Sequence, residues 1–489
     1  MRSNPAVCSF GRRRFLQVGA QLTSGLLLQG LAHARQQAPM NVVLILADDM
    51  GWTGPGCYGS DLHETPHIDG LAREGVRFTD AYTASPVCTP TRASIMTGKH
   101  PARLNMTIWS ERAIVRRTDK GNRKLAPPIT EAHLALEYET IAEILRKSGY
   151  RTVHVGKWHL GGARQYPETQ GFEVNIGGTL WGAPSTYWYP YQRVRKTGSG
   201  ELELRYVPHL EFGEKGEYLT DRLTAEAIAA LEQVRDEPFF LHMAYHSPHT
   251  PIEGKPALVE YYERKRREGM NHHNARYAAM VHSLDENVGR LLEKLEEWQV
   301  ADRTLVIFYS DNGGFTEVRD AEQVTSNAPL RSGKGSLYEG GIRVPLIFKC
   351  PGLIPAGGVC PAPVTSTDLF PTILDLLGLQ GALPDAVEQD GLSLAGLLAD
   401  PHASLDRDTL YFHYPHYYFN TTPVSALRHK NWKFLEYYED GRRELYDLAQ
   451  DRGETNDLAD AHPEQVQRLH SMLNEWRSRV KARLPEPNT

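Results

Sequence analysis

Carboxylate and amide side chains follow two strand-like segments of this 489-residue chain and offer only oxygen ligands. Asp48 and Asp49 end the first segment, and Asp311 and Asn312 end the second. Each pair has a plain explanation, because Asp-Asp after a strand is commonly a helix cap and Asp-Asn-Gly-Gly is commonly a turn. Brought together, the four side chains would suit a hard cation such as Ca²⁺ or Mg²⁺ better than Zn²⁺.

Basic side chains and histidines occur in other polar loops. They are Arg92 in CTPTR, Lys157 and His159 in GKWHLGG, His249 in SPHTP and Lys334 in RSGKGS. Singly, such lysines are usually solvated, and a histidine in a proline-rich loop usually lies on the surface. Grouped near a bound cation, three positive charges and two histidines could hold a tetrahedral oxyanion and move protons at it.

Alternating helices and buried strands are predicted to position these residues. Apolar runs of strand length occur at 41–47, 151–155, 239–245 and 304–309, and the last three follow helical patterns. Such alternation predicts an α/β fold, a large domain with a mainly parallel central sheet flanked by helices. Because open α/β sheets bind ligands at the carboxyl ends of their strands, the polar residues that follow the runs are expected to meet there.

The last fifth of the chain lacks this alternation. Short strand-like segments are followed by one amphipathic helix, which predicts a small C-terminal α+β subdomain at 405–484, after the large domain at 38–400. Two aromatic segments, 179–191 and 411–419, are expected either to wall a pocket for sugar or aryl groups or to pack in the core.

The first residues are typical of an export signal. Arginines at 12–14 precede a short apolar stretch and a small-x-small motif at 32–34. Adjacent arginines followed by Phe-Leu resemble the twin-arginine signature. Residues 1–34 are therefore predicted to be a signal peptide that the twin-arginine translocase exports to a bacterial periplasm or beyond. The alternative is an uncleaved amphipathic anchor.

Charge and composition exclude some partners. The formal net charge of −6 argues against nucleic acid, and no apolar run beyond the N-terminus is long enough to predict a membrane span in the mature chain. No Cys/His spacing suits zinc. Cys350 and Cys360 flank the turn-rich PGLIPAGGV, and we consider a disulfide between them a hypothesis for an oxidising compartment.

The stretch around Cys88 carries a specific motif. Residues 88–98 read CTPTRASIMTG, and residues 149–161 read GYRTVHVGKWHLG. Together these segments resemble the two signatures of the sulfatase family, in the alkaline-phosphatase-like superfamily. LADDMGW, FYSDNGG and GGIRVPLIFKCPG match as well, so the resemblance runs from about residue 40 to residue 480. Thr91 stands where the family usually has Ser or Ala, while the Cys-x-Pro-x-Arg core is intact.

The resemblance implies that a formylglycine-generating enzyme oxidises Cys88 to Cα-formylglycine. One hydroxyl of the hydrated aldehyde would attack sulfur, and the second would later lose its proton and expel sulfate. Carried over by motif position, the residues around one Ca²⁺ would be Asp48, Asp49, Asp311, Asn312 and the modified Cys88.

The resemblance also implies a role for each remaining residue. Arg92 would orient the formylglycine, and Lys157 and Lys334 would contact the sulfate oxygens. His249 would protonate the leaving oxygen, and His159 would take the proton from the hydroxyl that expels sulfate.

The predicted function is that of an arylsulfatase-like sulfuric ester hydrolase, and bacterial export favours sulfated carbohydrates as its substrates. One alternative is a formylglycine-dependent phosphonate monoester or phosphodiester hydrolase, which shares the cysteine motif. Another is an inactive member that only binds ligands. Two-metal phosphatases fit less well, because Asp311-Asn312 stands where such relatives tend to show Asp-His.

Overall fold

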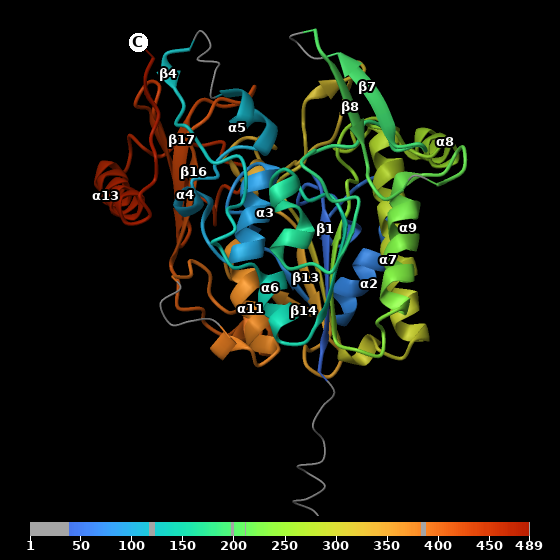
Figure 1. Ribbon diagram of the computed structural model, residues 1–489. Helices are drawn as coiled ribbons and strands as arrows, with labels where there is room; N and C mark the ends of the chain where they lie inside the picture. The colour runs from blue at the N-terminus through green and yellow to red at the C-terminus, as the bar shows by residue number, and fades with distance from the viewer. Residues whose placement is uncertain (1–38, 117–122, 197–199, 211, 383–387, 489) are drawn as a thin grey trace, which may run out of the picture. The chain divides into compact units, whose positions relative to one another are not determined.

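An eight-stranded sheet lies at the centre of the fold (Figure 1). The computed structural model describes residues 39–116, 123–196, 200–210, 212–382 and 388–488. The strands in sheet order are β14 (Gly358–Cys360), β2 (Val76–Phe78), β13 (Leu346–Lys349), β10 (Thr304–Ser310), β1 (Asn41–Ala47), β9 (Phe239–Ala244), β5 (Arg151–Gly156) and β6 (Val174–Ile176). Neighbouring strands are parallel except where β13 pairs with β10 and β2. The mainly parallel sheet and its four predicted strands are therefore confirmed.

Helices cover both faces of this sheet (Figure 1). One face carries α2 (Pro66–Glu74), α7 (Leu219–Glu232) and α9 (Ala275–Glu297), and the other carries α3 (Cys88–Thr97), α6 (Ile141–Lys147) and α11 (Leu369–Leu376). Val43 and Ile45 of β1 share one apolar core with Leu223 of α7 and Leu284 of α9. Because both faces are covered, β1 is buried along its whole length and its carboxyl end is held rigidly.

A smaller antiparallel sheet forms the C-terminal subdomain. Its strands are β16 (Thr409–Tyr414), β17 (Val424–His429), β18 (Trp432–Tyr437) and β19 (Arg443–Asp447), paired in chain order. The helix α13 (Pro463–Arg479) packs on this sheet through Leu469 and Leu473. Other side chains of the sheet pack against Tyr82 and Ile342 of the large domain. The predicted α+β subdomain is confirmed, and residues 41–489 cluster as one compact unit.

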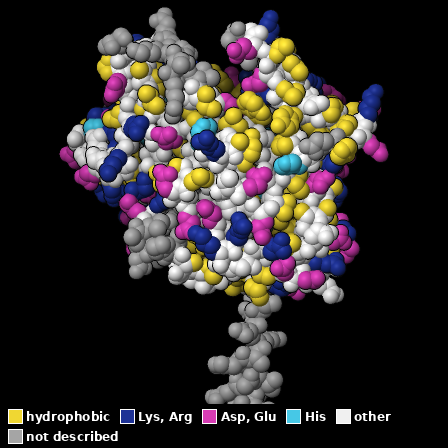
Figure 2. Space-filling view, viewed as in Figure 1, with side chains coloured by type: hydrophobic (Ala, Val, Ile, Leu, Met, Phe, Trp, Pro, Cys, Tyr) yellow, Lys and Arg dark blue, Asp and Glu magenta, His cyan; other side chains and the backbone are white. Residues whose placement is uncertain are grey.

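Shorter elements connect these layers. The helices are α4 (Pro101–Leu104), α5 (Ser110–Arg116), α8 (Pro256–Lys265), α10 (Glu339–Ile342) and α12 (Ala395–Ala399). The strand pairs are β3 (Ala81–Tyr82) with β15 (Val364–Thr365), β4 (Leu125–Ala126) with β20 (Glu486–Pro487), β7 (Gln192–Lys196) with β8 (Leu202–Tyr206), and β11 (Val318–Arg319) with β12 (Glu322–Gln323). The β7–β8 hairpin exposes apolar side chains, among them Val194 and Leu204. Figure 2 shows hydrophobic side chains gathered on this part of the surface.

The N-terminal signal predicted at 1–34 lies outside the described residues. Within the described part of the chain, no helix is both long enough and apolar enough to cross a membrane.

The disulfide hypothesis is wrong in this structure, which does not join Cys350 to Cys360. The sheet order explains why. Cys360 ends β14, Cys350 follows β13, and β2 lies between these two strands. Two strand spacings already separate the cysteines by roughly 9.6 Å, whereas a disulfide needs Cα atoms within about 7 Å.

Candidate active site

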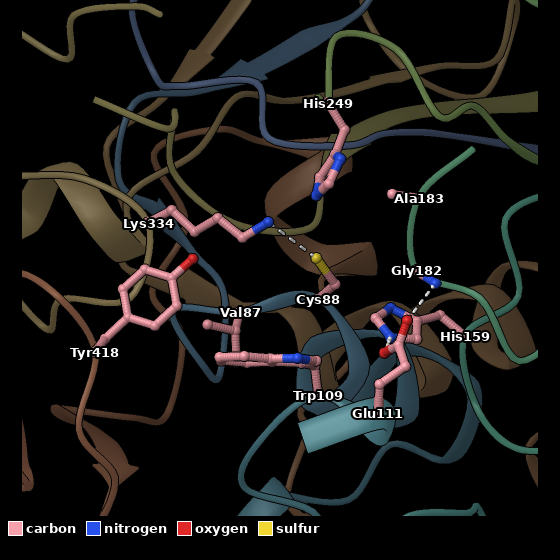
Figure 3. Close-up of a pocket in the computed structure, with 10 residues that line it drawn as sticks. All are labelled: Val87, Cys88, Trp109, Glu111, His159, Gly182, Ala183, His249, Lys334 and Tyr418. Carbon is pink, nitrogen blue, oxygen red and sulfur yellow. Dashed lines mark hydrogen bonds and ion pairs between the residues drawn. The ribbon is translucent and has the colours of Figure 1, made fainter. Parts of the chain in front are cut away.

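A pocket opens above the first turn of α3, near the carboxyl ends of the central strands (Figure 3). The lining residues are Val87, Cys88, Trp109, Glu111, His159, Gly182, Ala183, His249, Lys334 and Tyr418. Cys88 is the first residue of α3, a helix of 10 residues. Because the amino end of a helix carries a partial positive charge, this position favours a bound anion.

The predicted oxygen ligands meet because their strands are neighbours. Ala47 at the end of β1 pairs with Ser310 at the end of β10, so the residues that follow both strands converge. The backbone N–H of Asp49 donates to Asp311 Oδ1 at 3.2 Å, and Asn312 Nδ2 donates to Asp49 Oδ1 at 2.7 Å. Asp49 adopts a left-handed φ of 64°, a strained conformation that is common at functional sites.

The residues present fit a hard cation. Ligand atoms of Asp48, Asp49, Cys88 and His249 all lie within 4.8 Å of one another. Asn312 Oδ1 is buried and has no hydrogen-bond partner among the described residues. A buried carbonyl oxygen normally has such a partner, so this atom is suited to a metal ion. The carboxylate and amide oxygens among these residues are ligands that hard cations prefer, and calcium stays a prediction.

Each carboxylate of the cluster also faces a buried cation. Lys157 Nζ lies 2.8 Å from Asp48, and Arg92 Nε lies 2.9 Å from Asp311. Burial by itself would raise the pKa of Asp311, but Arg92 and Lys157 lower it well below its ordinary value. Lys157 and Arg92 lie behind the carboxylates and are not among the pocket-lining residues. The roles predicted for them at sulfate and at formylglycine remain predictions.

Lys334 reaches the pocket itself. Its Nζ lies 2.7 Å from Asp49 Oδ1 and 3.4 Å from the Cys88 sulfur (Figure 3). Burial raises the pKa of the Cys88 thiol to about 12, and Asp311 adds to that rise. A thiol with so high a pKa stays protonated at neutral pH and is a poor nucleophile. The unmodified cysteine is therefore unsuited to attack an ester.

Thr91, the departure from the usual motif, is buried one helical turn from Cys88. Its hydroxyl donates to the backbone oxygen of Ser85 at 3.0 Å. The side chain thus helps to hold the loop that leads into α3.

The two histidines face the pocket from different loops. His249 Nδ1 lies 2.8 Å from the Thr250 oxygen, which leaves Nε2 toward the pocket, 3.5 Å from Asp49 Oδ2. Burial and then Lys334 lower the pKa of His249 to about 3. His159 has its Nε2 at 2.6 Å from Glu111 Oε2, while its buried Nδ1 has no hydrogen-bond partner among the described residues.

Glu111 is a site residue that the sequence motifs did not indicate. Its second oxygen accepts the backbone N–H of Gly182 at 2.9 Å, so the carboxylate is fixed between two loops (Figure 3). Burial would raise the pKa of Glu111, but His159 and the Gly182 N–H lower it, which keeps the group ionised. WSERAIV resembles an ordinary helix start, and nothing in it marks Glu111.

The aromatic segments contribute to the pocket only in part. Tyr418 lines it, as do Gly182 and Ala183 between the aromatic residues of the first segment. Tyr187 and Tyr414 belong to apolar cores instead. Trp109, which lies outside both segments, forms the pocket floor beneath Cys88 in Figure 3. Some residues of these segments therefore line the pocket, and others pack in the core.

The chain is similar to known proteins over most of its length. The family described as Sulfatase matches residues 40–379, and the family described as N-sulphoglucosamine sulphohydrolase, C-terminal, matches residues 333–480. A protein of Formosa agariphila named Sulfatase is 31% identical over 504 residues, covering 89% of this chain and 88% of that protein. N-acetylgalactosamine-6-sulfatase of Homo sapiens is 32% identical over 394 residues, covering 78% of this chain and 70% of that protein.

A solved structure is similar over nearly the whole chain. The crystal structure of Ps i-CgsB in complex with k-i-k-neocarrahexaose has a TM-score of 0.72 and 28% identity. The alignment covers 90% of this chain and 92% of that one.

Proposed function

The chain belongs to the sulfatase family of sulfuric ester hydrolases, and from this premise we propose that it hydrolyses sulfate monoesters of carbohydrates. The observation that carries the proposal is the buried cluster at the amino end of α3, in which Cys88 contacts Asp48 and Lys334 and lies near Asp49. The carbohydrate class is supported by the relative named N-acetylgalactosamine-6-sulfatase and by the relative solved with a neocarrahexaose.

Two groups would complete the site. Cys88 would be converted to formylglycine, whose hydrate supplies one hydroxyl to attack sulfur and a second whose deprotonation releases sulfate. Asp48, Asp49, Asp311 and Asn312 would hold one calcium ion, which supplies Lewis-acid polarisation when bound. The orphaned Asn312 Oδ1 and the oxygen-only set support this assignment.

The chain's own residues would bind the ester and move its protons. Lys334 and the amino end of α3 attract the sulfate. His159 accepts a proton at Nδ1, because Nε2 is engaged by Glu111. His249 donates from Nε2 to the leaving oxygen, since a bound sulfate beside the ring favours the imidazolium.

Maturation and export would require further partners. The intact Cys-x-Pro-x-Arg core supports a formylglycine-generating enzyme as the modifying partner. The arginines at 12–14 support export by the twin-arginine translocase, which would place the mature protein in the periplasm or outside the cell.

Two measurements test this function. We expect the highest kcat/KM on a sulfate monoester when sulfate, phosphate and phosphonate esters are compared. In protein from the native host, we expect the mass of the peptide carrying position 88 to show the aldehyde. Fastest turnover of a phosphodiester, or an intact thiol at position 88, would contradict the proposal.

Calcium removal is expected to reduce activity and stability together. Without the cation, the carboxylates of Asp48, Asp49 and Asp311 repel one another in a buried site, whereas bound calcium stabilises only the folded state. At about 100 times its Kd, calcium should add about 2.7 kcal/mol to the free energy of unfolding. Urea unfolding and turnover after exhaustive chelation measure this effect. Re-added calcium should restore both, and full activity in the chelated protein would argue against the metal site.

Glu111→Gln is expected to lower kcat by about tenfold to a hundredfold with little change in KM. In the wild type, the Glu111 carboxylate keeps the proton of His159 on Nε2, so that Nδ1 is the proton acceptor. The glutamine amide has no negative charge to do this. Steady-state kinetics on an aryl sulfate, with its pH profile, measure the effect. Glu139→Gln removes a partly exposed carboxylate that pairs with Lys147, away from the pocket, and serves as the control. An unchanged kcat and pH profile for Glu111→Gln would show that the pair has no role in proton transfer.

A further inference from the structure

An aromatic path leads from the pocket to the surface of the C-terminal subdomain. Tyr418 lines the pocket, and its ring centroid lies 4.0 Å from that of Phe419. Phe419 meets Phe315 edge-on, with 5.5 Å between their centroids. Phe315 is buried, whereas 53% of Phe419 is exposed. The outer end of the path is therefore an open aromatic ring supported by a buried one.

Arg319 adds a positive charge to this outer end. The guanidinium carbon of Arg319 lies 5.1 Å from the centre of the Phe315 ring. Arg319 belongs to β11 and is exposed. Within the described residues, Arg319 forms no ion pair with a carboxylate. Glu322, its neighbour across the β11–β12 ladder, pairs with Arg266 at 2.8 Å instead. Arg319 is thus a cation without a carboxylate counter-ion in the part of the chain that the structure describes.

Arg319 also acts on the pocket wall. Burial raises the pKa of the Tyr418 phenol, and the positive charges of Lys334 and Arg319 both oppose that rise. Arg319 and the pocket lysine therefore both lie close enough to Tyr418 to act on it electrostatically, and both attract negative charge.

The loop that carries Phe419 is held in place. Asn420 Nδ2 donates to the backbone oxygen of Lys334 at 3.1 Å, and the backbone of Tyr418 pairs with that of Thr421. Gly335, at a φ of +90°, makes room for the Tyr418 ring, since a Cβ there would lie 2.0 Å from Tyr418 Cδ1. A ring presented by an anchored loop loses little conformational entropy on binding.

We propose that Phe419 and Arg319 form an outer subsite that binds a neighbouring anionic sugar while the pocket holds the reacting sulfate of an oligosaccharide. The inference rests on the proposed sulfatase function and adds a substrate class, namely chains that carry more than one anionic group. The apolar C–H face of a sugar packs on an exposed aromatic ring. A guanidinium binds a sulfate or carboxylate through paired hydrogen bonds. Because Phe419 contacts Tyr418 of the pocket wall, the outer subsite would adjoin the pocket.

Binding and turnover test the subsite separately. Binding uses the full chain and a fluorescently labelled dextran sulfate hexasaccharide. Turnover uses 4-methylumbelliferyl sulfate, which carries a single sulfate and cannot span both positions. Arg319→Ala should weaken hexasaccharide binding by about tenfold, because a charged hydrogen bond is lost. Phe419→Ala should weaken it by about fivefold. Both variants should keep kcat/KM for the aryl sulfate within about twofold of the wild type.

Two control variants remove similar exposed side chains elsewhere. Arg264, on α8, is 67% exposed, and Phe212 is 90% exposed; neither lines the pocket. Arg264→Ala and Phe212→Ala should leave hexasaccharide binding unchanged. Wild-type protein that does not bind the hexasaccharide, or Arg319→Ala and Phe419→Ala variants that bind it as tightly as wild type, would overturn the subsite. Hexasaccharide binding that both variants weaken, in a protein that hydrolyses no sulfate ester, would uphold the subsite and refute the proposed function.

Discussion

Cys88→Ala should reduce turnover of any sulfate ester by about 10⁴-fold or more, because it removes the group that becomes the nucleophile. The protein should still fold. Alanine fits the first turn of α3, and the sulfur makes only long contacts, 3.6 Å to Asp48 and 3.4 Å to Lys334. Steady-state kinetics together with thermal unfolding measure the two effects. Cys360→Ala, at the end of β14, removes another buried thiol and should retain activity.

Cys88→Ser tests the need for the second hydroxyl of the aldehyde hydrate, because serine supplies one hydroxyl as a nucleophile but no second one. A serine can in principle attack sulfur, but the resulting ester has no neighbouring hydroxyl to expel sulfate. We therefore expect no multiple turnover, and any product should stop at one equivalent. Intact-protein mass after incubation with substrate detects a retained sulfate. Sustained turnover by Cys88→Ala or Cys88→Ser would show that formylglycine is not the reacting group.

The sequence predicted the parts of the site that follow from strand order along one edge. Asp48, Asp49, Asp311 and Asn312 each come directly after a buried apolar run, and neighbouring parallel strands bring such positions together.

Other features depend on tertiary arrangement that local patterns do not encode. Glu111 of α5 contacts His159, which lies 48 positions away in a loop, and its own segment contains no motif. The disulfide hypothesis failed because sequence proximity of Cys350 and Cys360 says nothing about β2 lying between their strands. The pairing of Lys157 with Asp48, both fully buried, is a further tertiary contact that the motif alone does not indicate, and the predicted contact of Lys157 with the sulfate stays a prediction.

Asp311→Ala should both inactivate and destabilise the protein. Arg92 and Asp311 are 1% and 0% exposed, and their side chains approach to 2.8 Å. Removing one partner of a buried ion pair leaves the other charge without compensation, which typically destabilises by about 3–5 kcal/mol. The change also removes an oxygen from the predicted calcium site. Urea unfolding in the presence of a chelator isolates the ion-pair effect, and unfolding in calcium shows the loss of metal stabilisation.

A double variant distinguishes the structural role of this pair from its chemical role. Arg92→Met with Asp311→Leu replaces both charges by apolar groups of similar size, and such replacements of buried ion pairs are often neutral or stabilising. We expect the double variant to recover most of the stability lost in Asp311→Ala and to remain inactive, since neither the metal ligand nor the guanidinium is restored. Recovery of activity along with stability would mean that the pair serves only the fold. Failure to recover stability would mean that Arg92 holds the site through its bond to the Lys157 backbone oxygen at 2.8 Å rather than through Asp311.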